Sequence, residues 1–199
     1  MLSAYSQAEY LATSTRQVEI PPTTPEHYIT GLYALNLAAP EGTSGDWHDV
    51  FHWQAGAEQP RQVTLAGMGD IATTPIYGDL GVYEGRDRLA AQGLDVPAGM
   101  RQVYIANHSR AILDLLYRSL HRWGRVLNLT GATTDWLDTR EQGERLLQQA
   151  TLLEPSFHPA AQDELRRWIA DEASALRAVY GRVKCAVARK QMIILRDRG

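Results

Sequence analysis

The chain is organised around residues 27–36, which read HYITGLYALN. Thr24, Pro25 and Glu26 stand directly before this stretch. They have the order of a helix start: a hydroxyl at the N-cap, a proline in the first turn and an acid near the positive end of the helix dipole. The apolar residues that follow recur at the spacing of one helical face. The pattern therefore predicts a helix over 25–36.

Short segments with aromatic and β-branched residues come next, separated by glycine and proline, which is typical of strands and turns. One of them has Gly78 and Asp79 near its middle, where we expect a tight bend between two strands. The predicted strands are 50–53, 63–66 and 102–105, together with a strand–turn–strand unit over 73–84.

From residue 107 onward the apolar residues recur with a period of about 3.6, which is that of an α-helix. Asn107 is suited to cap the first of these helices, which should end near Gly124. Two prolines, Pro155 and Pro159, interrupt the helical pattern. The predicted helices are 107–124, 133–147 and 160–183, and residues 192–195, MIIL, are predicted as a last strand.

These elements predict an α+β fold, in which a small, mostly antiparallel sheet in the N-terminal half packs with a helical C-terminal half. We expect a single domain over 1–199. Within it, 21–124 would form a mixed α/β subdomain and 133–199 a mainly helical one. A cleft between two such subdomains is a natural place for a functional site.

The composition is that of an ordinary globular protein, with 44% apolar residues and a net charge of −3 over 199 residues. The protein as a whole therefore does not attract nucleic acid electrostatically. Its one cysteine, Cys185, excludes an intramolecular disulfide, which fits a reducing compartment. The first residues lack the basic start and apolar run of a signal peptide, and no apolar stretch reaches membrane-spanning length. We expect a cytoplasmic protein without a membrane partner.

Asp46, His48 and His52 are of the residue types that bind a divalent metal. Two histidines four residues apart point to one side of a helix, and the carboxylate could complete the ligand set. Alternatively, the aromatic residues between them are core residues, and the histidines are edge groups satisfied by hydrogen bonds. The metalloprotease motif His-Glu-x-x-His is absent.

Asn107, His108 and Arg110 open a predicted helix, whose free N–H groups and positive dipole end suit an anion or a phosphate. Alternatively, Asn107 is only a cap and Arg110 pairs with Asp114 one turn later. His27 is a further candidate for binding a partner or an anion.

Asp79 is another such candidate, because an acid flanked by glycines at a bend can project into a site. It can equally be a turn residue and no more.

Basic residues concentrate near the C-terminus, where they could contact nucleic acid or an acidic partner. They lack the interleaved aromatic residues of a surface that binds single strands. A solvated structural face is the alternative. The basic residues are Arg182, Lys184, Arg189, Lys190, Arg196 and Arg198.

An enzymatic reading combines Asp46, His48, His108 and Arg110 in one site. The histidines would bind a divalent metal or act as general acid and base, and Arg110 would neutralise a phosphate. The reaction would be that of a metal-dependent nuclease or a phosphoryl-processing hydrolase. The sequence contains no Walker A motif, no Gly-x-Gly-x-x-Gly, no Gly-x-Ser-x-Gly and no Cys-x-x-Cys.

The order of four motifs, HYITG at 27–31, GDWH at 45–48, GDLG at 78–81 and ANHSRA at 106–111, resembles that of an uncharacterised family of small bacterial proteins. The resemblance covers residues 26–120. The genes of that family lie beside nucleotidyltransferase-like genes of the abortive-infection type. The resemblance implies one half of a toxin–antitoxin or phage-defence pair, and it implies no catalytic residues.

The leading expectation is therefore a non-catalytic, antitoxin-like component that acts by binding a partner protein, with a nucleotidyltransferase-like toxin as the candidate partner. In this reading the helical C-terminal half holds the partner, and the N-terminal motifs shape a shared cleft. It requires no cofactor, whereas the enzymatic alternative requires a divalent metal.

Overall fold

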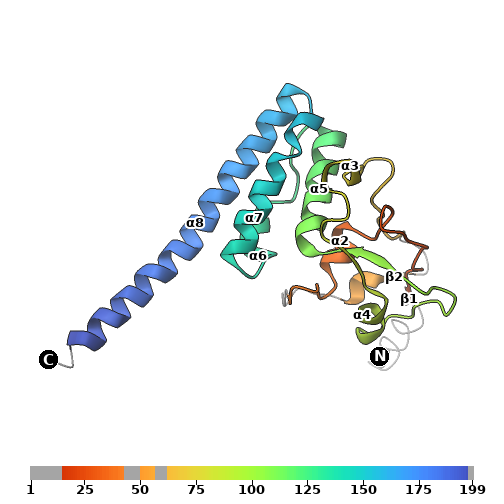
Figure 1. Ribbon diagram of the computed structural model, residues 1–199, viewed down its shortest axis with the longest axis horizontal. Helices are drawn as coiled ribbons and strands as arrows, with labels where there is room; N and C mark the ends of the chain where they lie inside the picture. The colour runs from red at the N-terminus through yellow and green to blue at the C-terminus, as the bar shows by residue number, and fades with distance from the viewer. Residues whose placement is uncertain (1–14, 43–49, 57–61, 197–199) are drawn as a thin grey trace, which may run out of the picture. The chain divides into compact units, whose positions relative to one another are not determined.

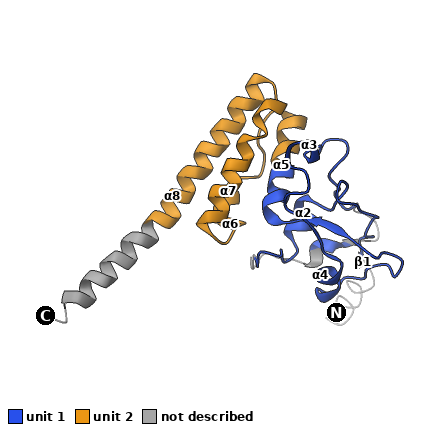
Figure 2. Ribbon diagram, in the orientation of Figure 1, with its two compact units in different colours: residues 1–115 blue, residues 116–199 orange. Residues whose placement is uncertain are grey.

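The computed structural model describes the backbone over 15–42, 50–56 and 62–196, and side chains over 17–42, 52–54 and 62–181. The chain forms two compact units, residues 1–115 and residues 116–199 (Figure 2). Among the described residues, all strands lie in the first unit and the longest helix lies in the second. The predicted α+β class is confirmed. No helix in the described part of the chain is both long and apolar enough to cross a membrane.

The first unit contains two small antiparallel sheets of two strands each (Figure 1). In one sheet, β1 (Thr15–Gln17) pairs with β2 (Gln54–Gly56). In the other, β3 (Val82–Glu84) pairs with β4 (Tyr104–Ala106). The predicted mostly antiparallel pairing is thus present, in strands of three residues.

An extended segment, residues 28–30, joins the second sheet to a further stretch of chain. On one side the Ile29 N–H donates to the Tyr104 carbonyl at 2.9 Å, and the Ala106 N–H donates to the Ile29 carbonyl at 2.8 Å. On the other side Thr30 N–H donates to the Thr64 carbonyl at 2.9 Å. Backbone pairing on both edges makes this segment the centre of the unit, and all three of its residues are buried.

The predicted helix over 25–36 is therefore wrong in its first half. Thr24 does cap locally, since its Oγ1 accepts the N–H groups of Glu26 at 3.2 Å and His27 at 3.1 Å, but a turn forms there instead of a helix. The helix α2 (Gly31–Leu35) begins only after the extended segment. Gly31 has φ +62°, which favours glycine at the change from strand to helix.

Two predicted strands are short helices instead. A 3-10 helix, η1 (Val50–Trp53), replaces the strand at 50–53. The helix α3 (Thr74–Tyr77) replaces the first arm of the predicted hairpin, because Pro75 supplies a helical φ at its start and the Thr73 carbonyl accepts the Tyr77 N–H at 3.1 Å. The helix α4 (Arg86–Ala91) then leads from β3 toward β4.

The helix α5 (His108–Trp123) follows β4 as predicted, and the boundary between the two units falls within it. Its predicted cap is confirmed, because Asn107 Oδ1 accepts the Arg110 N–H at 2.9 Å.

In the second unit α6 (Ala132–Asp135) and α7 (Arg140–Thr151) both pack on α8 (Pro159–Arg196), with the 3-10 helix η2 (Glu154–Ser156) before it. The single helix predicted over 133–147 is thus two helices. The second one starts with a capping box, in which Thr139 accepts the Gln142 N–H. The predicted last strand at 192–195 is wrong, because α8 continues through it.

Each unit has its own apolar core. In the first unit the largest enclosed side chain is Trp53, which contacts Tyr33 edge to face with the ring centroids 5.1 Å apart. In the second unit Trp168 is buried, and its Nε1 donates to the Leu129 carbonyl at 2.9 Å. The other buried apolar residues of the second unit include Leu137, Leu146, Leu153, Leu165 and Leu176.

Candidate functional site

A buried ion pair on consecutive turns of α5 is the centre of the polar chemistry in the first unit. Arg110 Nε lies 3.2 Å from Asp114 Oδ1, and the two side chains are 1% and 0% exposed. The carboxylate also accepts three hydroxyl groups from two other segments: Thr73 at 2.5 Å and Tyr28 at 3.3 Å on Oδ1, and Thr30 at 2.6 Å on Oδ2. We call these five residues the Asp114 cluster.

The Arg110 guanidinium connects α5 to the turn between α3 and β3. Its Nη1 donates to the Leu80 carbonyl at 2.8 Å and to the Gly78 carbonyl at 3.2 Å, and its Nε donates to the Tyr28 hydroxyl at 2.8 Å. Its Cζ lies 5.1 Å from the Tyr28 ring centroid and 5.2 Å from that of Tyr77. The cation is held by carbonyls, a carboxylate and two aromatic faces, all from the same unit.

Burial dominates the electrostatics of the cluster. It raises the pKa of the Asp114 carboxyl, while Arg110 and the hydroxyls of the cluster act in the opposite direction. Burial likewise raises the pKa of Tyr28 and Tyr77 above the usual range of tyrosine, so both phenols are neutral at physiological pH. Solvent does not reach Tyr28, Thr30, Thr73 or Asp114. This arrangement holds four segments of chain together and presents almost no polar surface to a ligand.

Asn107 connects the start of α5 to two loops. Its N–H donates to the Gly81 carbonyl at 2.6 Å, and its Nδ2 donates to the Glu41 carboxylate. Gly81 has φ +77°, and a Cβ there would lie 2.7 Å from Asn107 Oδ1 and 2.9 Å from Arg110 Cβ. Only glycine allows this approach of the turn to the helix start.

A pocket of about 290 Å³ lies beside Asn107. Tyr83 lines this pocket, and its hydroxyl is buried and has no hydrogen-bond partner within the described ranges. The Glu41 carboxylate on the same pocket disfavours an anionic ligand there by like-charge repulsion. Of the residues predicted to bind a partner or an anion, only Asn107 lines this pocket, whose lining residues are Pro40, Glu41, Gly81, Val82, Tyr83 and Asn107.

The other predicted site residues of the first unit do not line that pocket. His108 is 2% exposed, and its Nε2 is 2.8 Å from the Leu37 carbonyl oxygen. Asp79 is exposed at the turn, where its carbonyl accepts the Val82 N–H at 2.9 Å. His27 closes the turn at Thr24, and its ring lies against Gly67.

Asp46 and His48 lie outside the described residues, so the predicted metal site stays a prediction. His52, its third member, contacts the Tyr33 ring edge to face with the centroids 4.8 Å apart. Within the part of the chain that the structure describes, no three histidine, cysteine, aspartate or glutamate residues group as metal ligands. The enzymatic reading also needs Asp46 and His48, and it is untested for the same reason.

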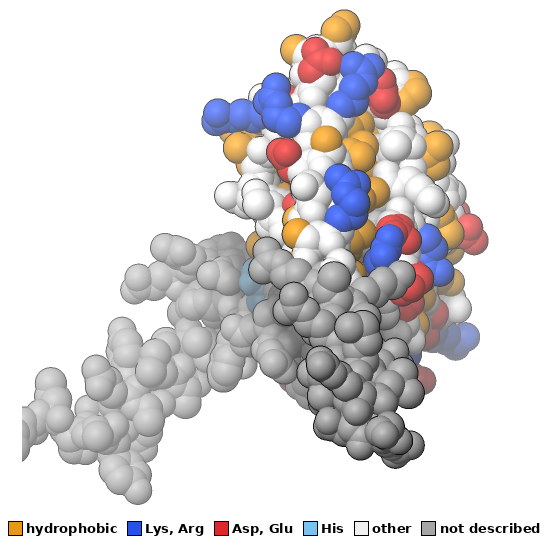
Figure 3. All heavy atoms as spheres, turned by 90° about the vertical axis from the view of Figure 1, so that its left-hand side faces the viewer, with side chains coloured by type: hydrophobic (Ala, Val, Ile, Leu, Met, Phe, Trp, Pro, Cys, Tyr) orange, Lys and Arg blue, Asp and Glu red, His pale blue; other side chains and the backbone are white. Residues whose placement is uncertain are grey.

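The side chains of the predicted basic segment, from Arg182 onward, also lie outside the described range. On the described part of the face in Figure 3, Lys and Arg side chains stand among acidic and apolar ones. They do not merge there into one continuous basic surface.

In the second unit the carboxylate of Glu172, on α8, holds the start of α6. It accepts the Gly131 N–H at 2.6 Å, the Thr133 N–H at 2.9 Å and the Thr133 hydroxyl at 2.7 Å, and Glu172 is 2% exposed. Sequence reasoning missed this role, as it missed Thr30 and Thr73. The one available signal was an acidic residue within the apolar stripe of a helix.

Comparison with known proteins assigns no family. No family model, no curated protein and no solved structure matches the chain. The residues, their contacts and the resemblance in motif order are therefore the basis of the proposed function.

Proposed function

We propose that this chain is a non-catalytic, antitoxin-like component of a bacterial toxin–antitoxin or phage-defence pair, and that it acts by binding a partner protein. The proposed partner is a nucleotidyltransferase-like toxin, as the motif order implies. The helical second unit supplies the main binding surface.

The observation that carries the proposal is the length of α8. The helix has 38 residues and so spans about 57 Å, whereas α7 has 12 residues and spans about 18 Å. Even with the four residues of α6 added to the 12 of α7, the two helices that pack on α8 are together less than half as long as α8. A helix gains most of its stability from packing of one face against another element, so a helix of this length is suited to a second protein surface.

The environment of the polar residues supports a non-catalytic role. Arg110 and His108, the two described members of the enzymatic alternative, are 1% and 2% exposed. Arg110 is held by Asp114 and by the carbonyls of the turn at 78–80. A catalytic group has to come within hydrogen-bond reach of its substrate, and neither side chain offers that reach in this arrangement.

Co-expression tests the proposal. The candidate partner, a nucleotidyltransferase-like protein proposed to be encoded beside this chain, is expressed alone, and then together with the affinity-tagged full chain. We expect growth arrest in the first case, growth in the second, and co-purification of the two proteins in a fixed ratio. A neighbour that is harmless alone and does not co-purify with the tagged chain would overturn the proposal.

A chain without α8 is not a suitable control, because α6 and α7 pack on that helix. The matched control is the tagged chain carrying His48→Ala, which removes a member of the enzymatic alternative and keeps the buried pair of Arg110 and Asp114. Circular dichroism checks its folding. If the protein binds and does not catalyse, this variant should restore growth as well as the unchanged chain does. Loss of protection by a folded His48→Ala variant would favour the enzymatic alternative.

A further inference from the structure

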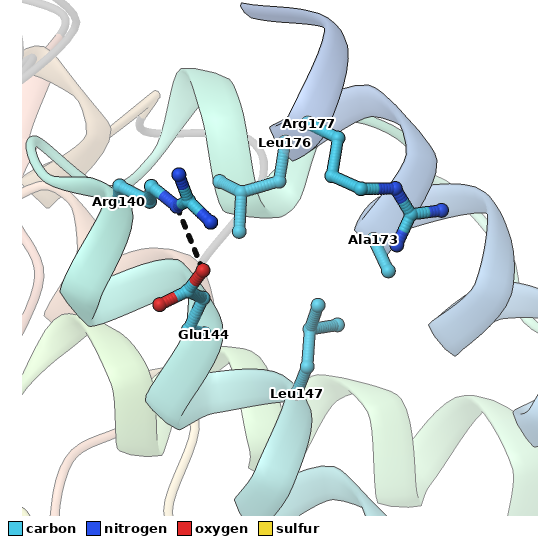
Figure 4. A pocket seen from close by; sticks show the side chains of 6 residues that line it. All are labelled: Arg140, Glu144, Leu147, Ala173, Leu176 and Arg177. Carbon is cyan, nitrogen blue, oxygen red and sulfur yellow. Dashed lines mark hydrogen bonds and ion pairs between the residues drawn. The ribbon is translucent and has the colours of Figure 1, made fainter. Parts of the chain in front are cut away.

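A small groove lies between α7 and α8 in the second unit (Figure 4). Its volume is about 190 Å³. Drug-sized ligands usually occupy pockets of about 300 to 1,000 Å³, so this one fits a single side chain better than a cofactor. The apolar lining residues are Leu147, Ala173 and Leu176, and the polar ones are Arg140, Glu144 and Arg177.

The shape of the groove follows from small residues on both helices. Gly143 lets α7 approach α8 closely, because a Cβ at that position would lie 2.8 Å from Leu176 Cδ1. On α8, the small side chain of Ala173 fills little of the groove that it lines together with Leu147 of α7 (Figure 4). The two leucines are 8% and 3% exposed, so they form an enclosed apolar floor.

The charges around the groove do not cancel. Arg140 Nε donates to Glu144 at 2.7 Å, which forms an internal ion pair (Figure 4). Arg177, on α8, makes no hydrogen bond or ion pair with any side chain in the described ranges. Its neighbours one turn away, Ala173 and Gly181, carry no charge. The groove therefore combines an apolar floor with one uncompensated cation.

We propose that this groove binds the partner protein through one apolar side chain and an aspartate or glutamate about one turn away from it. The apolar side chain packs on Leu147, Ala173 and Leu176, and the acidic one pairs with Arg177. This inference rests on the proposed function, because it assumes that the chain acts by binding a protein. Charge complementarity selects an acidic partner surface and disfavours a basic one.

A selection from random peptides tests the groove without a known partner. A phage-displayed library of random peptides is selected against the full chain, and the enriched peptides are sequenced and synthesised. We expect an apolar residue within four positions of an aspartate or glutamate. No enrichment, or enrichment of basic peptides, would overturn the inference.

Charge reversal then locates the binding. Arg177→Glu should weaken the enriched peptides by about tenfold or more, because an attraction becomes a repulsion. A peptide with lysine in place of its acid should recover the affinity for this variant. The matched control is Arg145→Glu, the same charge change on α7 outside the groove. Equal affinities of the Arg177→Glu and Arg145→Glu variants for the enriched peptides would contradict binding at this groove.

The groove and the proposed function can fail separately. If the neighbouring protein co-purifies equally with the unchanged chain and with Arg177→Glu, the proposed function stands and the groove is not the binding site. If the neighbour never co-purifies, yet acidic peptides bind in an Arg177-dependent way, the groove stands and the partner is another protein.

Discussion

Arg110 Nε and Asp114 Oδ1 lie 3.2 Å apart on consecutive turns of α5, and both side chains are almost fully buried. A pair in this position stabilises the fold only while both members are present. Removing one leaves the other as an uncompensated charge in a medium of low polarisability. The pair also connects segments that lie far apart in the sequence, because Thr30 and Thr73 donate to the same carboxylate.

Asp114→Asn should therefore be strongly destabilising although it hardly changes the side-chain volume. It leaves the Arg110 charge unpaired, and we expect a loss of about 3 to 5 kcal/mol in the free energy of unfolding. Urea denaturation followed by circular dichroism measures it. Arg167→Gln, which breaks an exposed ion pair with Glu164, is the control and should cost less than about 1 kcal/mol. Equal losses for the two variants would contradict the role assigned to the buried pair.

Gly81→Ala should disturb the start of α5. The backbone at φ +77° is strained for alanine, which costs about 1 to 3 kcal/mol, and the new Cβ would displace the Asn107 side chain that caps the helix. Gly93→Ala is the matched control, since Gly93 has φ +80° and a Cβ there would have no neighbour within 4 Å. It should lose only the cost of the left-handed backbone, about 1 to 2 kcal/mol, with no clash added. Thermal or urea unfolding of both variants compares them, and a smaller loss for Gly81→Ala than for Gly93→Ala would refute the contact argument.

Glu172→Gln should loosen α6 in the second unit. The carboxylate accepts three hydrogen bonds. The glutamine side chain replaces one acceptor oxygen by an N–H donor and so cannot accept all three. We expect the free energy of unfolding to fall by about 1 to 3 kcal/mol. Hydrogen exchange at the amides of Gly131 and Thr133 should accelerate first. Glu164→Gln, on the same helix and more exposed, is the control and should leave both amides protected. Unchanged exchange at Gly131 in the Glu172→Gln variant would count against this role.

The long helices could be predicted because their signals are local. Asn107 caps α5 through a contact to Arg110, three residues away, and the apolar stripe that follows has the period of a helix. The extended segment at 28–30 could not be predicted in the same way. Its backbone partners lie at 64–66 and 104–106, and pairing on both edges overrides the helical spacing of the apolar residues.

The polar cluster was predictable in part for the same reason. Arg110 and Asp114 are four residues apart, so their pairing follows from helix geometry. The sequence accordingly predicts this pair as one of two alternatives for Arg110, the other being an anion site. The hydroxyls of Thr30 and Thr73 come from 84 and 41 residues away, and no sequence spacing connects them to Asp114. The run at 192–195 was ambiguous, because a short apolar run has no period that separates strand from helix.

The buried tyrosines predict how stability changes at alkaline pH. Burial raises the pKa of Tyr28, Tyr77 and Tyr83 in the folded protein above the value of about 10 for an unfolded chain. The unfolded state therefore loses protons first, and the folded state loses stability as the pH rises above about 10.

Ultraviolet absorbance of tyrosinate follows the ionisation of the phenols, and circular dichroism, recorded on the same samples, follows the loss of the fold. Of the nine tyrosines, the three whose pKa is raised by burial, Tyr28, Tyr77 and Tyr83, should stay neutral until the fold is lost. Tyr77→Phe should remove one of the three tyrosines that ionise only on unfolding. It should therefore reduce the stability that the protein loses at alkaline pH. Ionisation of all nine tyrosines near pH 10, as expected for unperturbed phenols, in a chain whose circular dichroism is still native would rule out the burial of these three hydroxyls.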